Sequence, residues 1–71
     1  MLVTAPQIAR LLGRPSRWAL RQTKAGWYGP AERRTRHHAY FDLATVERVE
    51  GITFDPEQLS RAGVDITLEI I

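Results

Sequence analysis

Cysteine is absent from this chain of 71 residues, so it has no disulfide bonds and none of the thiolate ligands that most zinc sites use. Long apolar runs are missing too, since none approaches the roughly 18 residues that a membrane-spanning helix needs. The first residues lack the positive start and the apolar stretch of a signal peptide. We therefore expect a cytoplasmic protein with no membrane partner.

The signatures of an enzyme are also missing. There is no glycine-rich loop for a nucleotide, and no catalytic constellation surrounds the two serines. His37 and His38 are adjacent, so in an extended chain they point apart and cannot share a metal ion. A domain of this size buries only about 60% of its unfolded surface, which leaves little room for a deep pocket. We expect no enzymatic activity, no metal and no cofactor.

Charge is present but unevenly distributed. Residues 1–41 contain eight basic side chains and one acid, a net of +7, whereas residues 42–71 contain two basic side chains and seven acids, a net of −5. The net charge of the whole chain is +2. A strongly basic half indicates a polyanionic partner, most often nucleic acid.

The first half begins with two short predicted helices. Thr4 and Gln7 have the spacing of a capping box, which predicts a helix over residues 5–12 that stops at Gly13. A second helix starts at Pro15 or Ser16, with Ser16 as its cap, and runs to Ala25. Two helices joined by so short a turn are typical of a helix-turn-helix, although a plain helical hairpin is the alternative.

Basic residues recur along the second predicted helix at spacings of three and four, which puts them on one face. They are Arg14, Arg17, Arg21 and Lys24. No acid lies between residues 1 and 31 to pair with them, as a purely solvated face would normally have. For the core-facing stripe we expect Ala19, Leu20 and Thr23, with Trp18 either half-buried or facing the partner.

A basic segment follows a turn near Gly29 and Pro30. Residues 31–38 are polar and basic, and residues 39–41 are typical of a short strand. A strand, a basic loop and a returning strand after a basic helix predict a wing, and arginines on such a wing suit a narrow minor groove or flanking phosphates. The alternative is a solvated surface loop. The arginines of this segment are Arg33, Arg34 and Arg36.

The second half predicts two more helices and a strand. Asp42 is expected to cap a helix over residues 43–49, with Val46 and Val49 on one side and Gly51 as its stop. A capping box from Asp55 to Gln58 predicts a further helix whose inward residues are Leu59 and Ala62, ended by Gly63. Residues 64–70 alternate as a half-buried strand does.

The order of these features resembles the compact winged helix-turn-helix domains of phage and mobile-element proteins. Residues 4–13 resemble the opening of excisionase-like and MerR-like domains, and residues 24–27 and 39–43 are similar to the DNA-binding domain of phage Mu repressor and transposase. The resemblance implies an α+β winged helix-turn-helix over residues 1–50, with three to four short helices and a hairpin wing. By position it implicates Ser16, Arg17, Arg21 and Lys24 on the helix, and Arg33, Arg34, Arg36 and His37 on the wing. This wing lacks the glycines common at such tips, and residues 51–71 form a helix-strand extension without a counterpart.

The expected function is sequence-specific binding of double-stranded DNA, as a phage-type transcriptional repressor, excisionase or architectural factor, associated with the nucleoid of a bacterial or phage-infected cell. The alternative is a protein-interaction module that uses the acidic half and the terminal strand. A homodimer or a head-to-tail assembly on DNA is compatible with the charge split. RNA ranks lower because the basic helix suits a wide major groove and aromatic residues are few.

Overall fold

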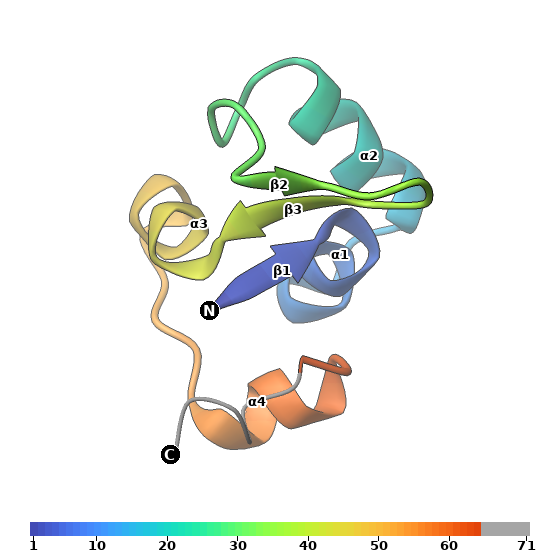
Figure 1. Ribbon diagram of the computed structural model, residues 1–71. Coiled ribbons are helices and arrows are strands. Elements are labelled where there is room, and N and C mark those ends of the chain that lie inside the picture. Colours follow the sequence, from blue (N-terminus) through green and yellow to red (C-terminus); the bar gives the residue numbers. More distant parts are fainter. Residues whose placement is uncertain (65–71) are drawn as a thin grey trace.

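The computed structural model describes residues 1–64 and shows a small α+β fold of four helices and a three-stranded antiparallel sheet (Figure 1). The α+β class is therefore confirmed. In chain order the elements are β1 (Leu2–Thr4), α1 (Ala5–Leu12), α2 (Ser16–Lys24), β2 (Arg33–Arg34), β3 (Ala39–Asp42), α3 (Leu43–Glu50) and α4 (Pro56–Arg61).

Helix α1 has the bounds that its caps predict. The Thr4 hydroxyl accepts from the backbone N–H of Gln7, and the Gln7 side chain accepts from the backbone N–H of Thr4. Gly13 ends the helix in the left-handed conformation, with φ of 66°, which glycine adopts without strain. Both ends are thus set by local hydrogen bonds that the sequence encodes.

Helix α2 differs from expectation in two respects. Pro15, not Ser16, is its N-cap residue, and no side chain caps it, so the predicted capping role of Ser16 is wrong. Leu20 was expected in the core but is 48% exposed, because the helix turns Ala19 inward and Leu20 lies about 100° around its circumference. Ala19 is the buried residue of this helix, and Trp18 is half-buried against the core.

The sheet has the order β1-β3-β2, so the strand that follows the hairpin turn is central. In β1 the register pairs Val3 with Phe41 of β3. Both of these side chains are buried. Arg33 and Arg34 lie in β2, paired with Tyr40 and Ala39, and are therefore strand residues where a loop was expected.

Helix α3 also differs in detail from its prediction. Asp42 occupies the N-cap position, but its side chain makes no capping hydrogen bond, so the expected cap is wrong. The backbone N–H of Leu43 instead donates to the carbonyl oxygen of Met1. Val46 is fully buried as expected, whereas Val49 is 39% exposed because Leu43 and Val46 form the inward stripe.

Helix α4 is capped as predicted, by reciprocal hydrogen bonds between Asp55 and Gln58. Leu59 and Ala62 face the core, and Gly63 follows with φ of 83°. The strand expected over residues 64–70 lies outside the described residues, except for Val64, which is buried.

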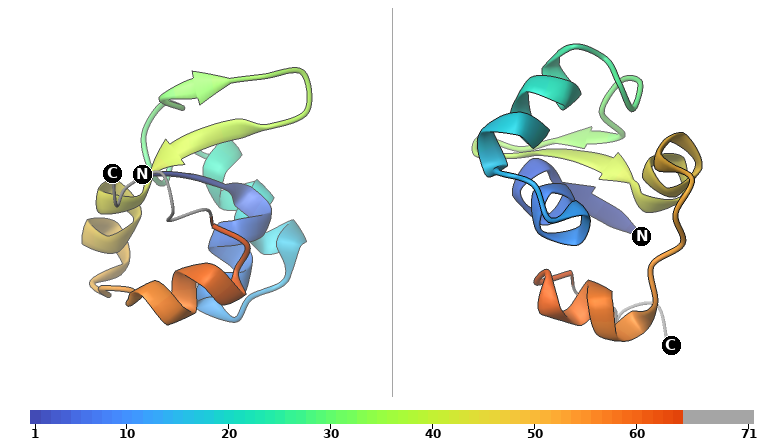
Figure 2. Two further views of the ribbon diagram at one scale, coloured as in Figure 1. Left: turned by 60° about the horizontal axis from the view of Figure 1, so that its bottom comes forward. Right: turned by 180° about the vertical axis from the view of Figure 1, so that it is seen from behind.

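Two long-range hydrogen bonds attach the end of α4 to α1. The Gln7 side-chain amide donates to the carbonyl of Gly63, and the Arg10 guanidinium donates to that of Ala62. Figure 2 shows α4 beside α1 and away from β2. The buried residues of the C-terminal part join the same core cluster as Val3, Ile8 and Val46; they are Phe54, Leu59, Ala62 and Val64.

Gln7 and Gln58 offer a matched test of this attachment, since each completes a capping box but only Gln7 also reaches across to the other helix. We expect Gln58→Ala to lower the free energy of unfolding by about 1 kcal/mol, and Gln7→Ala by roughly 1 kcal/mol more. Chemical denaturation measures both values. Equal losses would show that the bond to Gly63 adds nothing to stability.

Candidate nucleic-acid interface

Helix α2 presents its cations on the side that faces away from the core. Arg17 and Arg21 each lie two positions from Ala19, which places them about 160° around the helix from that buried residue. Arg14 and Lys24 extend the row at either end. We call Arg14, Arg17, Arg21 and Lys24 the basic helix face, and all four are exposed.

No acid neutralises this face within residues 1–64. The ion pair in this part of the chain joins Glu57 and Arg61 on α4, far from α2 in the sequence. The Arg14 guanidinium lies over the ring of Trp18, 5.2 Å from its centroid, in a cation–π contact that orients the side chain but leaves its charge in place. Among the described residues, the basic helix face is therefore a concentration of positive charge without an acidic partner.

Ser16 is exposed in the first turn of α2, beside Arg17. Its hydroxyl makes no hydrogen bond with residues 1–64 and caps no backbone group. A hydroxyl at the start of a helix, next to a basic row, is chemically suited to donate to a phosphate or to a base edge.

The hairpin of β2 and β3 closes without glycine. The backbone N–H of Thr35 donates to the His38 carbonyl at 2.8 Å, and the Thr35 hydroxyl accepts from the His38 N–H at 3.2 Å. Arg36 and His37 occupy the two central positions of the turn. Because neither Arg36 nor His37 has a positive φ, the turn needs no left-handed residue, and this explains how a tip without glycine can form.

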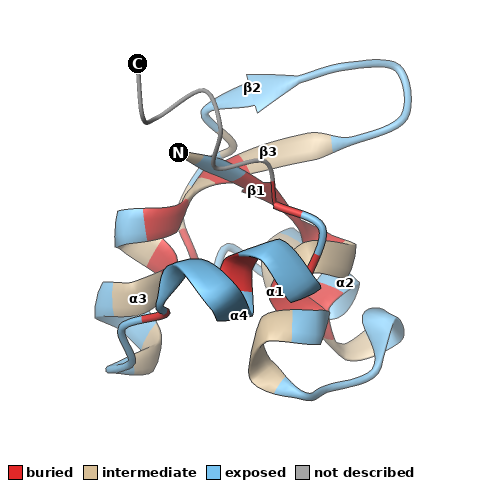
Figure 3. Cartoon of the chain, turned by 90° about the horizontal axis from the view of Figure 1, so that it is seen from below, coloured by how far each residue is buried: buried red, intermediate tan, exposed pale blue. Residues whose placement is uncertain are grey.

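The two arginines of β2 lie on opposite faces of the hairpin, because successive side chains of a strand alternate. Arg34 pairs with Ala39 and faces α2, whereas Arg33 pairs with Tyr40 on the other face. Figure 3 shows β2 and the turn exposed, while much of β1 is buried. Sequence reasoning treated these cations as one loop and did not separate them.

A groove of about 240 Å³ separates α2 from the hairpin. Leu20, Thr23 and Lys24 line it from the helix, residues 34–39 line it from the hairpin, and Phe41 contributes from β3. The fold thus brings Lys24 together with Arg34, Arg36 and His37. Arg17 and Arg21 do not line the groove and stay on the open side of the helix.

The carboxylate of Glu50, the last residue of α3, holds the chain where it leaves α2. One oxygen of Glu50 accepts from the Trp27 indole N–H at 3.1 Å and from the Tyr28 hydroxyl at 2.8 Å. The Tyr28 ring also packs edge-on against Phe41, with 6.4 Å between centroids. No local pattern links positions 27 and 28 with position 50, so only the tertiary fold reveals this contact.

Burial raises the pKa of Tyr28, and the hydrogen bond to Glu50 and the negative charge of that carboxylate raise it further. The hydroxyl is thus held in its neutral, donating form. This donor anchors the turn after α2 at the end of α3.

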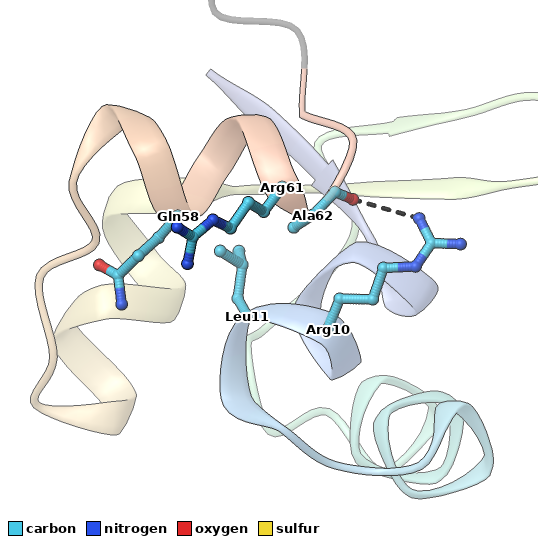
Figure 4. Close-up of a pocket in the computed structure, with 5 residues that line it drawn as sticks. All are labelled: Arg10, Leu11, Gln58, Arg61 and Ala62. Carbon is cyan, nitrogen blue, oxygen red and sulfur yellow. Dashed lines mark hydrogen bonds between the residues drawn. The ribbon is translucent and has the colours of Figure 1, made fainter.

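A second hollow, of about 230 Å³, lies between α1 and α4 (Figure 4). Its charged groups are engaged within the fold, since Arg10 donates to the Ala62 carbonyl and Arg61 pairs with Glu57. Leu11 and Gln58 complete the lining. This hollow therefore lies at the packing contact between α1 and α4.

Two other kinds of site are absent from the described part of the chain. Residues 1–64 contain no group of three or more histidine, cysteine or acidic side chains that could hold a metal ion. No helix among these residues has the length and apolar character needed to cross a membrane.

Tyr28→Phe tests the anchor. We expect it to lower the free energy of unfolding by about 1–3 kcal/mol near neutral pH, because it removes a hydrogen bond to a charged acceptor. The unfolded chain releases the tyrosine proton above a pKa of about 10, whereas the folded chain retains it, so the native protein loses stability as the pH rises beyond that value. This alkaline loss should be smaller in Tyr28→Phe. Denaturant titrations at neutral and alkaline pH measure both effects, and an identical alkaline loss in the two proteins would contradict the assignment.

Comparison with known proteins gives no match to this chain. No family model, no curated protein and no solved structure matches it. The charge and geometry of the basic surface are therefore the guide to what the protein binds.

Proposed function

We propose that this protein binds double-stranded DNA sequence-specifically as a winged helix-turn-helix domain, with α2 in the major groove and the β2–β3 hairpin as the wing. The observation that carries the proposal is the basic helix face, which points away from the core and has no acidic partner within residues 1–64. The hairpin supports it, because its cations share a groove with Lys24.

The geometry of α1 and α2 supports the same function. Three residues separate Leu12, the last of α1, from Ser16, the first of α2, a connection typical of a helix-turn-helix. Helix α2 is nine residues long, or roughly 14 Å. An α-helix with its side chains is about 10–12 Å in diameter, so a major groove about 12 Å wide admits it. An A-form RNA duplex has too narrow a major groove for it, which favours DNA.

The proposal divides the basic residues by role. Arg17 and Arg21, on the open side of α2, would read guanine edges, since a bidentate arginine is the commonest specific contact to guanine. Ser16 would add a contact at the helix start. The phosphate contacts would come from the groove residues Lys24, Arg34, Arg36 and His37, with Arg14 at the other end of the helix. Arg33, on the opposite face of the hairpin, would contribute less to DNA binding.

The resemblance to phage and mobile-element domains suggests the biological setting. A repressor, an excisionase or an architectural factor would each use this surface in the same way. A single domain covers few base pairs, so a specific factor of this size would act as a dimer or in an array on its site.

The acidic half gives less support to an assembly module than its charge suggests. Glu47 accepts from the backbone N–H of Phe54, Glu50 holds Trp27 and Tyr28, Asp55 caps α4, and Glu57 pairs with Arg61. The first three of these acids hold donors of the fold, and Glu57 is already paired on the surface of α4. We therefore favour DNA binding over protein interaction as the primary function.

The first test is the salt dependence of binding to a labelled duplex. With roughly 5–7 phosphate contacts, the slope of log K against log salt should be about −4 to −6, a loss of some 10²- to 10³-fold or more between about 50 and 200 mM salt. Fluorescence anisotropy at several salt concentrations measures it, with an RNA duplex of the same sequence as the comparison. An affinity for DNA that barely changes with salt, or one matched by the RNA duplex, would rule the proposal out.

A second test separates the proposed roles. Arg21→Ala should cost roughly 1–3 kcal/mol on the preferred duplex and relax the base preference, because it removes a base contact. Arg34→Ala should weaken all duplexes alike and reduce the salt slope by about one. Arg33→Ala is the matched control on the opposite face of the same strand and should cost less than Arg34→Ala. Sequence-blind losses of equal size in all three variants would contradict this division.

A further inference from the structure

Leu20 is an apolar side chain at the edge of the basic helix face. It is 48% exposed, and the other large exposed apolar residues of the described chain, such as Trp27 and Ile52, lie outside α2. Single exposed apolar residues are common on protein surfaces. Exposure alone therefore does not indicate a role for Leu20, whereas the residues around it can.

Its neighbours on the helix surface are cations. Leu20 lies three residues after Arg17 and four before Lys24, the spacings at which helical side chains adjoin one another. Thr23, also beside it, donates its hydroxyl proton to the Leu20 carbonyl at 2.9 Å, so that proton is used within the helix. On the helix surface Leu20 is thus an apolar side chain flanked by two cations.

The hairpin and the start of α1 border one side of Leu20. Leu20 lines the groove together with Ala39 and Phe41, and a second part of the same hollow adds Ala5 and Pro6 from the start of α1. Phe41 is buried and central in the sheet. One side of Leu20 therefore borders apolar groups of the fold, while the other is open on the side of the proposed DNA contact.

We propose that Leu20 is a specificity-determining residue that contacts the 5-methyl group of thymine in the major groove. This inference rests on the proposed function. Thymine is the base that presents a methyl group there, and apolar side chains recognise it by burying that methyl from water. Arg17 and Arg21 would select guanine, and Leu20 would add a preference for thymine at a neighbouring position of the site.

The test uses the duplex that the native protein selects from a random pool, synthesised with each thymine replaced in turn by deoxyuridine. Uracil keeps the hydrogen-bonding groups of thymine and lacks only the methyl. We expect one or two positions at which the native protein binds roughly three- to fivefold more weakly, the factor that burial of one methyl group supports. In Leu20→Ala these positions should become indifferent to the methyl, while all others behave as in the native protein.

Ile52→Ala is the matched control, because Ile52 is 44% exposed but follows α3 and does not belong to α2. It should keep the native pattern of thymine and uracil discrimination. The readout is a ratio between two duplexes, so a general loss of stability in Leu20→Ala does not change it.

Three outcomes would overturn the inference: a Leu20→Ala variant that keeps the native ratio at every position, a native protein that ignores the methyl throughout, or a selected site without thymine. In each of these cases the native protein still binds its duplex. A native protein that binds no duplex at all would instead refute the proposed function, so the two failures are distinguishable.

Discussion

The position of α2 depends on one small buried side chain. Ala19 is fully buried and is the residue through which the helix meets the core, whereas Trp18 and Thr23 are only partly covered on either side of it. Helix α1 likewise contributes the buried alanines Ala5 and Ala9 besides Ile8. Short side chains let a helix lie close to its neighbour, and so narrow a contact leaves most of the circumference of α2 to solvent. The fold can expose a whole row of cations because so little of this helix is needed to hold it.

The two halves of the chain differ in what their charged side chains do as well as in the sign of their charge. Three acids near α3 and α4, Glu47, Glu50 and Asp55, accept backbone, indole or phenol hydrogen bonds, and each of these three fixes a loop or a helix end. The cations of α2 and the hairpin make no such hydrogen bonds within residues 1–64. Arg10, a cation of the same half of the chain, differs from them because it helps attach α4. Charge left without an internal partner is the physical basis for proposing an external polyanion, and its concentration around α2 is more informative than the net charge.

Local chemistry made much of this fold predictable. The bounds of α1 and the start of α4 follow from capping boxes that lie within four residues, and the glycine stops follow from the left-handed conformation that they adopt. The errors concern features that distant residues decide. Leu20 is exposed because the rotation of α2 is set by packing, and β2 forms because β3 offers it a register, not because Arg33 and Arg34 favour strands. Glu50 could not be identified, since its partners are more than 20 residues away. The cations of the candidate site were correctly placed at the surface, whereas their division between two faces of the hairpin required coordinates.

Both tryptophans of the chain belong to the surroundings of one helix. Trp18 sits within α2 beneath the guanidinium of Arg14, and Trp27 follows the end of α2, 54% exposed, with its indole N–H on Glu50. The tryptophan emission of the native protein therefore originates at the two ends of α2. Any ligand that displaces Arg14 or disturbs the turn after Lys24 changes the environment of an indole. The protein contains its own optical probe of this helix, and no dye has to be attached to the surface under study.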